Sequence, residues 1–190
     1  MLHPAGAGRA AVQIDFPPLS PGVTERCTIK VMRFPRIIRL DDSDTRVYEK
    51  LAVPGEWAVP GSFVFINADP DSLDARQQEA FRHGFLGTSS FGWGTLVMVD
   101  EIGDQEYEKV IEDLANHFMR HYGAPDREAA LAAAREEAGF AASLCEHEIN
   151  TLLAMERKIE GENVVESFRV VSPPNAIDHD SIRLWAIEDD

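Results

Sequence analysis

The sequence has little cysteine. Among 190 residues only Cys27 and Cys145 occur, far apart along the chain. Secreted domains stapled by disulfides carry several cysteines at short spacings. No apolar run approaches the ~20 residues that a membrane-spanning helix needs. The first residues also lack the apolar core of a secretory signal peptide. Together these absences predict a cytoplasmic protein with reduced thiols.

Basic residues are also scarce: 18 Lys and Arg stand against 33 Asp and Glu, which gives a net charge of −15. Proteins that bind nucleic acid or anionic membranes need a basic face. The densest basic cluster carries Arg33, Arg36 and Arg39. Those three could form a small anion site, but the polar edge of a strand is the favoured interpretation. We therefore expect neither nucleic acid nor membrane as a partner.

The phosphate-binding glycine motifs are missing as well. The run "GFLGTSSFGWGTLVMVD", residues 84–100, is rich in glycine. It has no G-x-G-x-x-G that opens a helix and no P-loop lysine. We predict a turn at residues 87–90 and a strand at 91–100, which puts Gly92 and Gly94 on one face of the strand. Such a face admits a close neighbour, and a packed helix is favoured over a ligand.

The remaining pattern predicts one α+β domain over residues 30–171. It is preceded by a disordered extension, residues 1–29, and followed by a tail, residues 172–190. Apolar periodicity and turn residues predict the elements in the order βββ-α-β-αα-ββ. Their expected ranges are strands 30–40, 45–52, 57–66 and 91–100, helices 69–83, 104–122 and 126–150, and a hairpin at 151–171. This order favours a mostly antiparallel sheet with three helices packed on one face.

The helix expected at 126–150 is apolar on two sides. An alanine-rich stripe runs along one side, and Phe140 and Leu144 project from roughly the opposite side. Such a helix is sandwiched, either between a sheet and a helix or between two subunits. We predict a homodimer, with the Phe140 and Leu144 side as its candidate interface.

Two groups of polar residues suggest chemistry. Asp113, His117 and His121 follow one another at i, i+4, i+8, a spacing that can share a metal ion. Measured against the apolar stripe of their helix, His117 and Asp113 fall on the polar side, so a solvated face is favoured. We expect no bound metal and no cofactor.

The second group surrounds Ser143 and His147, which invite comparison with a nucleophile and its base. No acid that orients the histidine and no oxyanion hole is specified, so we expect no catalytic residues. The alternative is a ligand pocket beside Gly92, Trp93 and Gly94. Its polar groups would be supplied by Ser89, Ser90, Glu137 and His147.

Four stretches carry a resemblance to a known family: "IRLDDSDTRVYE", "PGEWAVPGSFVF", "GFLGTSSFG" and "AREEAGFAASLCEH". Across roughly Met32 to Val171 the chain resembles a family of short, uncharacterised proteobacterial proteins, a domain of unknown function. The resemblance implies an accessory role beside molybdenum-dependent oxidoreductases and cofactor-attachment enzymes, and it implies no functional residue.

The favoured function is therefore a non-catalytic accessory protein that binds a partner protein, with a link to the assembly of a metal-cofactor oxidoreductase. The alternative is a small-molecule-binding protein or enzyme that uses the pocket beside Gly92, Trp93 and Gly94.

Overall fold

The computed structural model describes residues 13–14, 32–66, 68–69, 72–160 and 163–171. The tail predicted at residues 172–190 lies outside these residues. So does the predicted disordered extension, except for Gln13–Ile14, which form the short strand β1. Within the described residues the fold is mixed α+β, as predicted, with its strands divided between two sheets.

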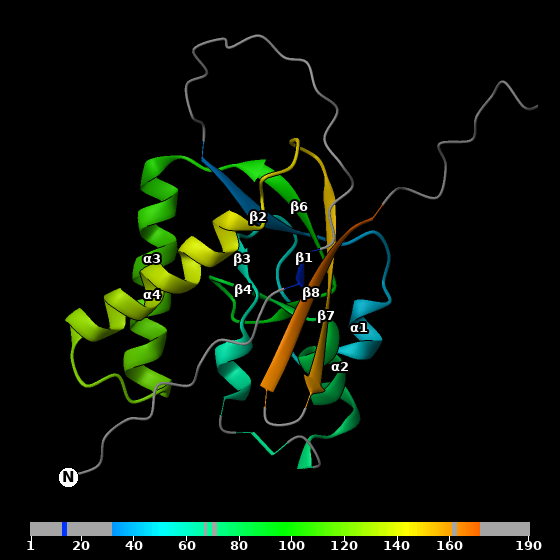
Figure 1. The fold of residues 1–190 in the computed structure, drawn as a ribbon, viewed down its shortest axis with the longest axis horizontal. Helices are drawn as coiled ribbons and strands as arrows, with labels where there is room; N and C mark the ends of the chain where they lie inside the picture. The colour runs from blue at the N-terminus through cyan, green and yellow to red at the C-terminus, as the bar shows by residue number, and fades with distance from the viewer. Residues whose placement is uncertain (1–12, 15–31, 67, 70–71, 161–162, 172–190) are drawn as a thin grey trace, which may run out of the picture.

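The larger sheet has the strand order β1-β8-β7-β6-β2 (Figure 1). Its strands besides β1 are β2 Arg33–Ile38, β6 Leu96–Glu101, β7 Leu152–Glu160 and β8 Asn163–Val171. These four pair antiparallel, whereas β1 joins β8 in parallel. Because β2 ends the sheet, Pro35 lies in an edge strand, where its missing N–H is tolerated.

Three main helices accompany the sheets. The helices α3 Asp104–His121 and α4 Arg127–Ser143 pack against each other on one side of the molecule, and α2 Ala75–His83 packs against β7 (Figure 1). Asp126 caps α4 through the amide of Ala129, and Gly123, at φ +65°, follows the end of α3. Both ends were expected from the sequence. No helix in the described ranges is long and apolar enough to cross a membrane.

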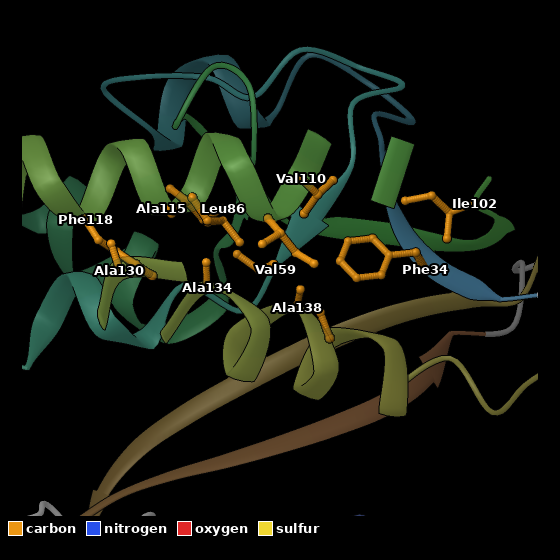
Figure 2. Packing of buried hydrophobic residues seen from close by; sticks show 13 residues of the cluster. Phe34, Val59, Leu86, Ile102, Val110, Ala115, Phe118, Ala130, Ala134 and Ala138 are labelled. Atoms are coloured by element: carbon orange, nitrogen blue, oxygen red, sulfur yellow. The ribbon is translucent and has the colours of Figure 1, made fainter. Parts of the chain in front are cut away.

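The smaller sheet lies between two hydrophobic cores. Its strands are β3 Ala58–Val59, β4 Phe85–Gly87 and β5 Trp93–Gly94. Since successive strand residues point to opposite faces, Ala58 and Phe85 join the core against the larger sheet. Val59 and Leu86 join the core against α3 and α4, where the alanines of α4 face them (Figure 2). The small sheet is thus covered on both faces.

This arrangement explains the two apolar sides of α4. Its alanines face α3 and the small sheet, whereas Phe140 and Leu144 pack into the core of the larger sheet. Of the two residues predicted for a dimer interface, Leu144 is buried in this core, whereas Phe140 is only partly buried. The helix also ends at Ser143 rather than at residue 150. Within the chain, α4 therefore lies between a helix and a sheet, which is the first of the two predicted alternatives.

Three local predictions are wrong. The first part of the strand expected at 45–52 is the short helix α1 Asp44–Val47, whose buried Asp44 accepts hydrogen bonds from the side chain and amide of Thr95. The last part is extended, and Leu51 forms a β-bridge with Trp93. The second half of the strand expected at 57–66 is the 3-10 helix η1 Ser62–Phe65, which follows Gly61 at φ +74°. The helix expected to begin at residue 69 begins at Ala75 instead, because Asp74 is its N-cap and forms a capping box with Gln77.

The strand predicted at residues 91–100 is divided in two. Thr95 alone separates β5, which belongs to the small sheet, from β6, which belongs to the larger one. The hydroxyl of Thr95 donates to Asp44 at 2.6 Å and hydrogen-bonds with the buried Tyr48 hydroxyl at 3.0 Å. The chain therefore passes from one sheet to the other at a residue held by two side chains of α1 and its C-cap.

Candidate functional site

The glycine face of the run 84–100 is closed by the chain's own backbone. A Cβ atom on Gly92 would collide with the carbonyl of Leu51. The same segment hydrogen-bonds with β5, since Trp93 N–H donates to Lys50 O at 2.8 Å and Ala52 N–H donates to Trp93 O at 2.9 Å. The close neighbour is thus an extended segment, and the predicted packed helix is wrong.

The turn at residues 88–91 is organised around a carboxylate. Glu56 Oε2 accepts from the amides of Ser89 and Ser90 at 2.9 and 2.8 Å, and its Oε1 accepts from the Ser90 hydroxyl at 2.5 Å. A Cβ on Gly87 would overlap this carboxylate. The amides of this turn therefore bind an internal anion, the carboxylate of Glu56.

Phe91, the last residue of this turn, has a left-handed backbone, with φ +51°. This conformation costs about 1–3 kcal/mol for a bulky residue and persists only where its surroundings impose it. The Phe91 ring stacks on the imidazole of His117 in α3, with centroids 3.7 Å apart and planes at 6°. The strained turn thus presents an aromatic side chain to the helix.

His117 is half-buried under Phe91, which differs from the solvated position expected from the helical pattern. Burial, together with a smaller electrostatic effect of the nearby His121 and Lys50 side chains, lowers its pKa from 6.5 to about 4. His117 is therefore neutral at physiological pH. The ring of His121 lies 4.7 Å from it along the same helix.

A groove, here called the α3 groove, opens between α3 and the turn. It has two lobes that share Lys50, Phe91, His117 and His121. The apolar lobe has a volume of about 360 Å³ and is also lined by Val64, Leu86, Trp93 and Tyr122. The polar lobe, of about 470 Å³, is also lined by Ser89, Ser90, Lys109, Asp113, Asn116 and Arg120.

The charges along the α3 groove are mostly positive. Lys109 forms an ion pair with Asp113 at 2.5 Å, which uses the one carboxylate of the lining. Within the described residues, Lys50 and Arg120 form no ion pair. Since the chain as a whole has a net charge of −15, two cations without an ion pair set this groove apart from the average composition of the chain.

The predicted metal residues Asp113, His117 and His121 all line this groove, but they do not form a metal centre. In the part of the chain that the structure describes, no three His, Cys, Asp or Glu side chains gather closely enough to hold a metal ion. Asp113 faces Lys109, and one face of His117 is covered by Phe91. The three residues do share one face of α3, as their spacing predicts.

The five residues of the predicted pocket divide between two places. Ser89, Ser90 and Trp93 line the α3 groove. Glu137 is buried and accepts from the amide of Gly61 at 3.1 Å, and the carbonyl of His147 accepts from the guanidinium of Arg33. These two residues are absent from the groove lining.

The comparison of Ser143 and His147 with a catalytic pair also has no support in the geometry. The Ser143 hydroxyl donates to the carbonyl of Phe140 at 2.6 Å, and α4 ends before His147. The neighbouring thiol is not activated, because burial raises the pKa of Cys145 to about 12. Thiolate chemistry needs the opposite shift.

Lys50, Arg120 and Phe91 line the groove but were not predicted as site residues. Arg120 shares its helical face with Asp113 and His117, because helix residues three and four apart are neighbours. The helical spacing could therefore have predicted its position. Lys50 lies in a segment that was taken for a strand. No local signal showed that Phe91 turns toward α3.

A family model described as a family of unknown function (DUF6505) matches residues 32–187, and the chain belongs to that family. The predicted resemblance to a domain of unknown function is thereby confirmed, and the match continues past Val171, where the resemblance was expected to end. No curated protein and no solved structure matches the chain.

Proposed function

We propose that the protein binds a small anionic organic molecule in the α3 groove. The observation that carries this proposal is the pair of cations Lys50 and Arg120, which converge on the groove and form no ion pair within the described ranges. In an acidic chain such a pair attracts an anion. Binding sites commonly join an apolar wall to a few convergent polar groups of this kind.

The rigidity of the groove wall supports the same proposal. Glu56 fixes the turn through the amides of Ser89 and Ser90, and the fixed turn imposes the strained φ of Phe91. A wall held in one conformation before the ligand arrives loses less entropy on binding. Strain of this size outside a functional site is uncommon.

A binding screen tests the proposal. The full chain is titrated with small carboxylates and phosphates while amide signals of α3 and of the turn are followed by NMR. We expect at least one acid to shift the groove amides saturably, and Lys50→Gln with Arg120→Gln to abolish the shifts. Lys158→Gln with Arg169→Gln removes the same two charges from exposed positions of β7 and β8 outside the groove and should change nothing. Shifts that survive in the double variant would overturn the proposal.

The accessory role remains a second proposal, and one observation favours it. On the β7–β8 hairpin, Ile159 and Val164 lie directly opposite each other and are 43% and 39% exposed. An exposed apolar cross-strand pair is a plausible contact for a partner protein or a second copy of the chain. A link to the assembly of a metal-cofactor oxidoreductase is part of this proposal.

Light scattering of the concentrated protein tests the homodimer within the second proposal. A dimer has twice the 21.1 kDa mass of one chain, and Ile159→Ser with Val164→Ser should return it to a monomer if the hairpin mediates it. A mass of 21.1 kDa for the unaltered chain at all concentrations would contradict the dimer.

A further inference from the structure

The two lobes of the α3 groove differ sharply in chemistry. In the apolar lobe, Leu86 is buried in the core, and Trp93 stacks on Phe65 with centroids 5.4 Å apart. Tyr122, 41% exposed, closes the lobe where α3 ends. An apolar group placed there would leave water for a wall of aromatic and aliphatic carbon, which is favourable by about 25 cal/mol per Å² buried.

The polar lobe offers positive charge and hydrogen-bond donors. Lys50 and Arg120 are exposed at its rim, and the amide of Asn116 lies on the same helical face. A guanidinium binds carboxylate or phosphate through two parallel hydrogen bonds, and an ammonium adds a point charge. This lobe therefore suits an acid group better than a neutral one.

The stacked rings of Phe91 and His117 lie where the two lobes meet, because both residues line both lobes. His117 carries no charge at physiological pH, since burial lowers its pKa to about 4. Apart from Lys50, which lines both lobes, the charged side chains of the groove line the polar lobe. The junction of the lobes carries the neutral stacked rings of Phe91 and His117. A charged lining and an aromatic and aliphatic lining therefore adjoin within one groove.

We infer that the ligand is an amphipathic organic anion, with an acid group at Lys50 and Arg120 and an apolar or aromatic body against Trp93 and Tyr122. The inference rests on the proposed function and narrows its ligand class. An inorganic anion would leave the apolar lobe hydrated. A neutral hydrophobe would leave the two cations without a partner. Only a molecule that carries both parts uses both lobes.

Three matched probes test the inference on the full chain: phenyl phosphate, inorganic phosphate and phenol. Each is titrated while NMR follows the amides of α3 and of the turn at residues 88–91. Because each part alone forgoes one lobe, we expect phenyl phosphate to bind at least about tenfold more tightly than either part, which corresponds to about 1.4 kcal/mol.

Variants assign each part to its lobe. Arg120→Gln should lower the affinity for phenyl phosphate and for phosphate alike by about three- to tenfold, a range typical of exposed charged contacts. Tyr122→Ser should lower the affinity for phenyl phosphate by a similar factor and leave the affinity for phosphate unchanged, because the substitution removes only an aromatic contact. Lys158→Gln is the control of equal charge. Amide spectra of each free variant show that it is folded.

The outcomes separate the inference from the proposed function. If phosphate binds the groove as tightly as phenyl phosphate, the amphipathic ligand is refuted while anion binding stands. If phenol binds as tightly as phenyl phosphate, both are refuted, because the acid group then contributes nothing. Groove amides that shift with none of the three probes at millimolar concentration refute the amphipathic ligand, and the screen of carboxylates and phosphates then decides anion binding by itself.

Discussion

Removal of the Glu56 carboxylate should release the turn that forms one wall of the α3 groove. Its two oxygens accept from the amides of Ser89 and Ser90, from the Ser90 hydroxyl and from the amide of Val53. In Glu56→Gln one oxygen becomes an NH₂ group, which is itself a donor and faces donors. The charge that strengthens the remaining bonds is lost with it.

The expected cost follows from these contacts. Hydrogen bonds to a charged group contribute about 1.5–3 kcal/mol, but Glu56 is half-exposed, so water replaces part of what is lost. We therefore expect a loss of about 2 kcal/mol in unfolding free energy rather than the sum of four bonds. For a chain of this size that is a fall in Tm of roughly 4–8 °C.

Thermal unfolding and amide NMR measure the effect together. The amides of Ser89 and Ser90 should lose protection from solvent exchange, and the resonances of Phe91 and His117 should move as their rings separate. Glu101→Gln, an exposed carboxylate at the end of β6, is the matched control and should stay within about 0.5 kcal/mol of the unaltered chain. An unchanged Tm with protected turn amides in Glu56→Gln would refute this account of the turn.

Three further predictions concern stability. Arg157→Met should lower the free energy of unfolding in urea by about 3–5 kcal/mol, because the fully buried guanidinium pairs with Glu166 at 2.6 Å and donates to carbonyls at the end of α2. The double variant Arg157→Met with Glu166→Leu should recover part of this stability. Equal losses in the single and double variants would contradict the buried-charge explanation. Gly92→Ala should destabilise strongly through collision with Leu51, whereas Gly139→Ala in α4, where a Cβ meets nothing within 4 Å, should add about 0.5–1 kcal/mol; similar Tm values for the two would refute the close approach. Above pH 6.5 the buried, neutral His117 costs nothing, but between pH 6.5 and 4 the unfolded chain takes up its proton first. The unaltered chain should therefore lose stability relative to His117→Gln across that window, and parallel unfolding curves would show that the pKa of His117 is not lowered.

The long elements were predictable because their signals are local. The apolar stripe of α3, the cap at Asp126 and the β7–β8 hairpin each depend on residues close in sequence. The segment 45–52 was not predictable in this way. Its alternating residues fit a strand, but Asp44 and Tyr48 are positioned by Thr95, about fifty residues further along. A contact over that separation leaves no local pattern.

The candidate site also combines features that depend on nearby residues with features that depend on residues far apart in the sequence. The polar face of α3 could be read from helical spacing, and the glycine run pointed to a close approach at Gly92. The partner of the run, Glu56, and the stacking of Phe91 on His117 join segments far apart in the chain. Burial of His117 depends on that stacking. The pattern along α3 alone therefore assigned this histidine to solvent.

The passage of the chain through Thr95 has a consequence for how the molecule opens. Because β5 and β6 are consecutive and only Thr95 separates them, neither sheet can detach without pulling on the other. Native-state hydrogen exchange should then show both sheets losing protection as one cooperative unit, at the free energy of global unfolding. The amide of Trp93, which lines the groove from β5 and donates to Lys50 O, should then stay protected until the core opens.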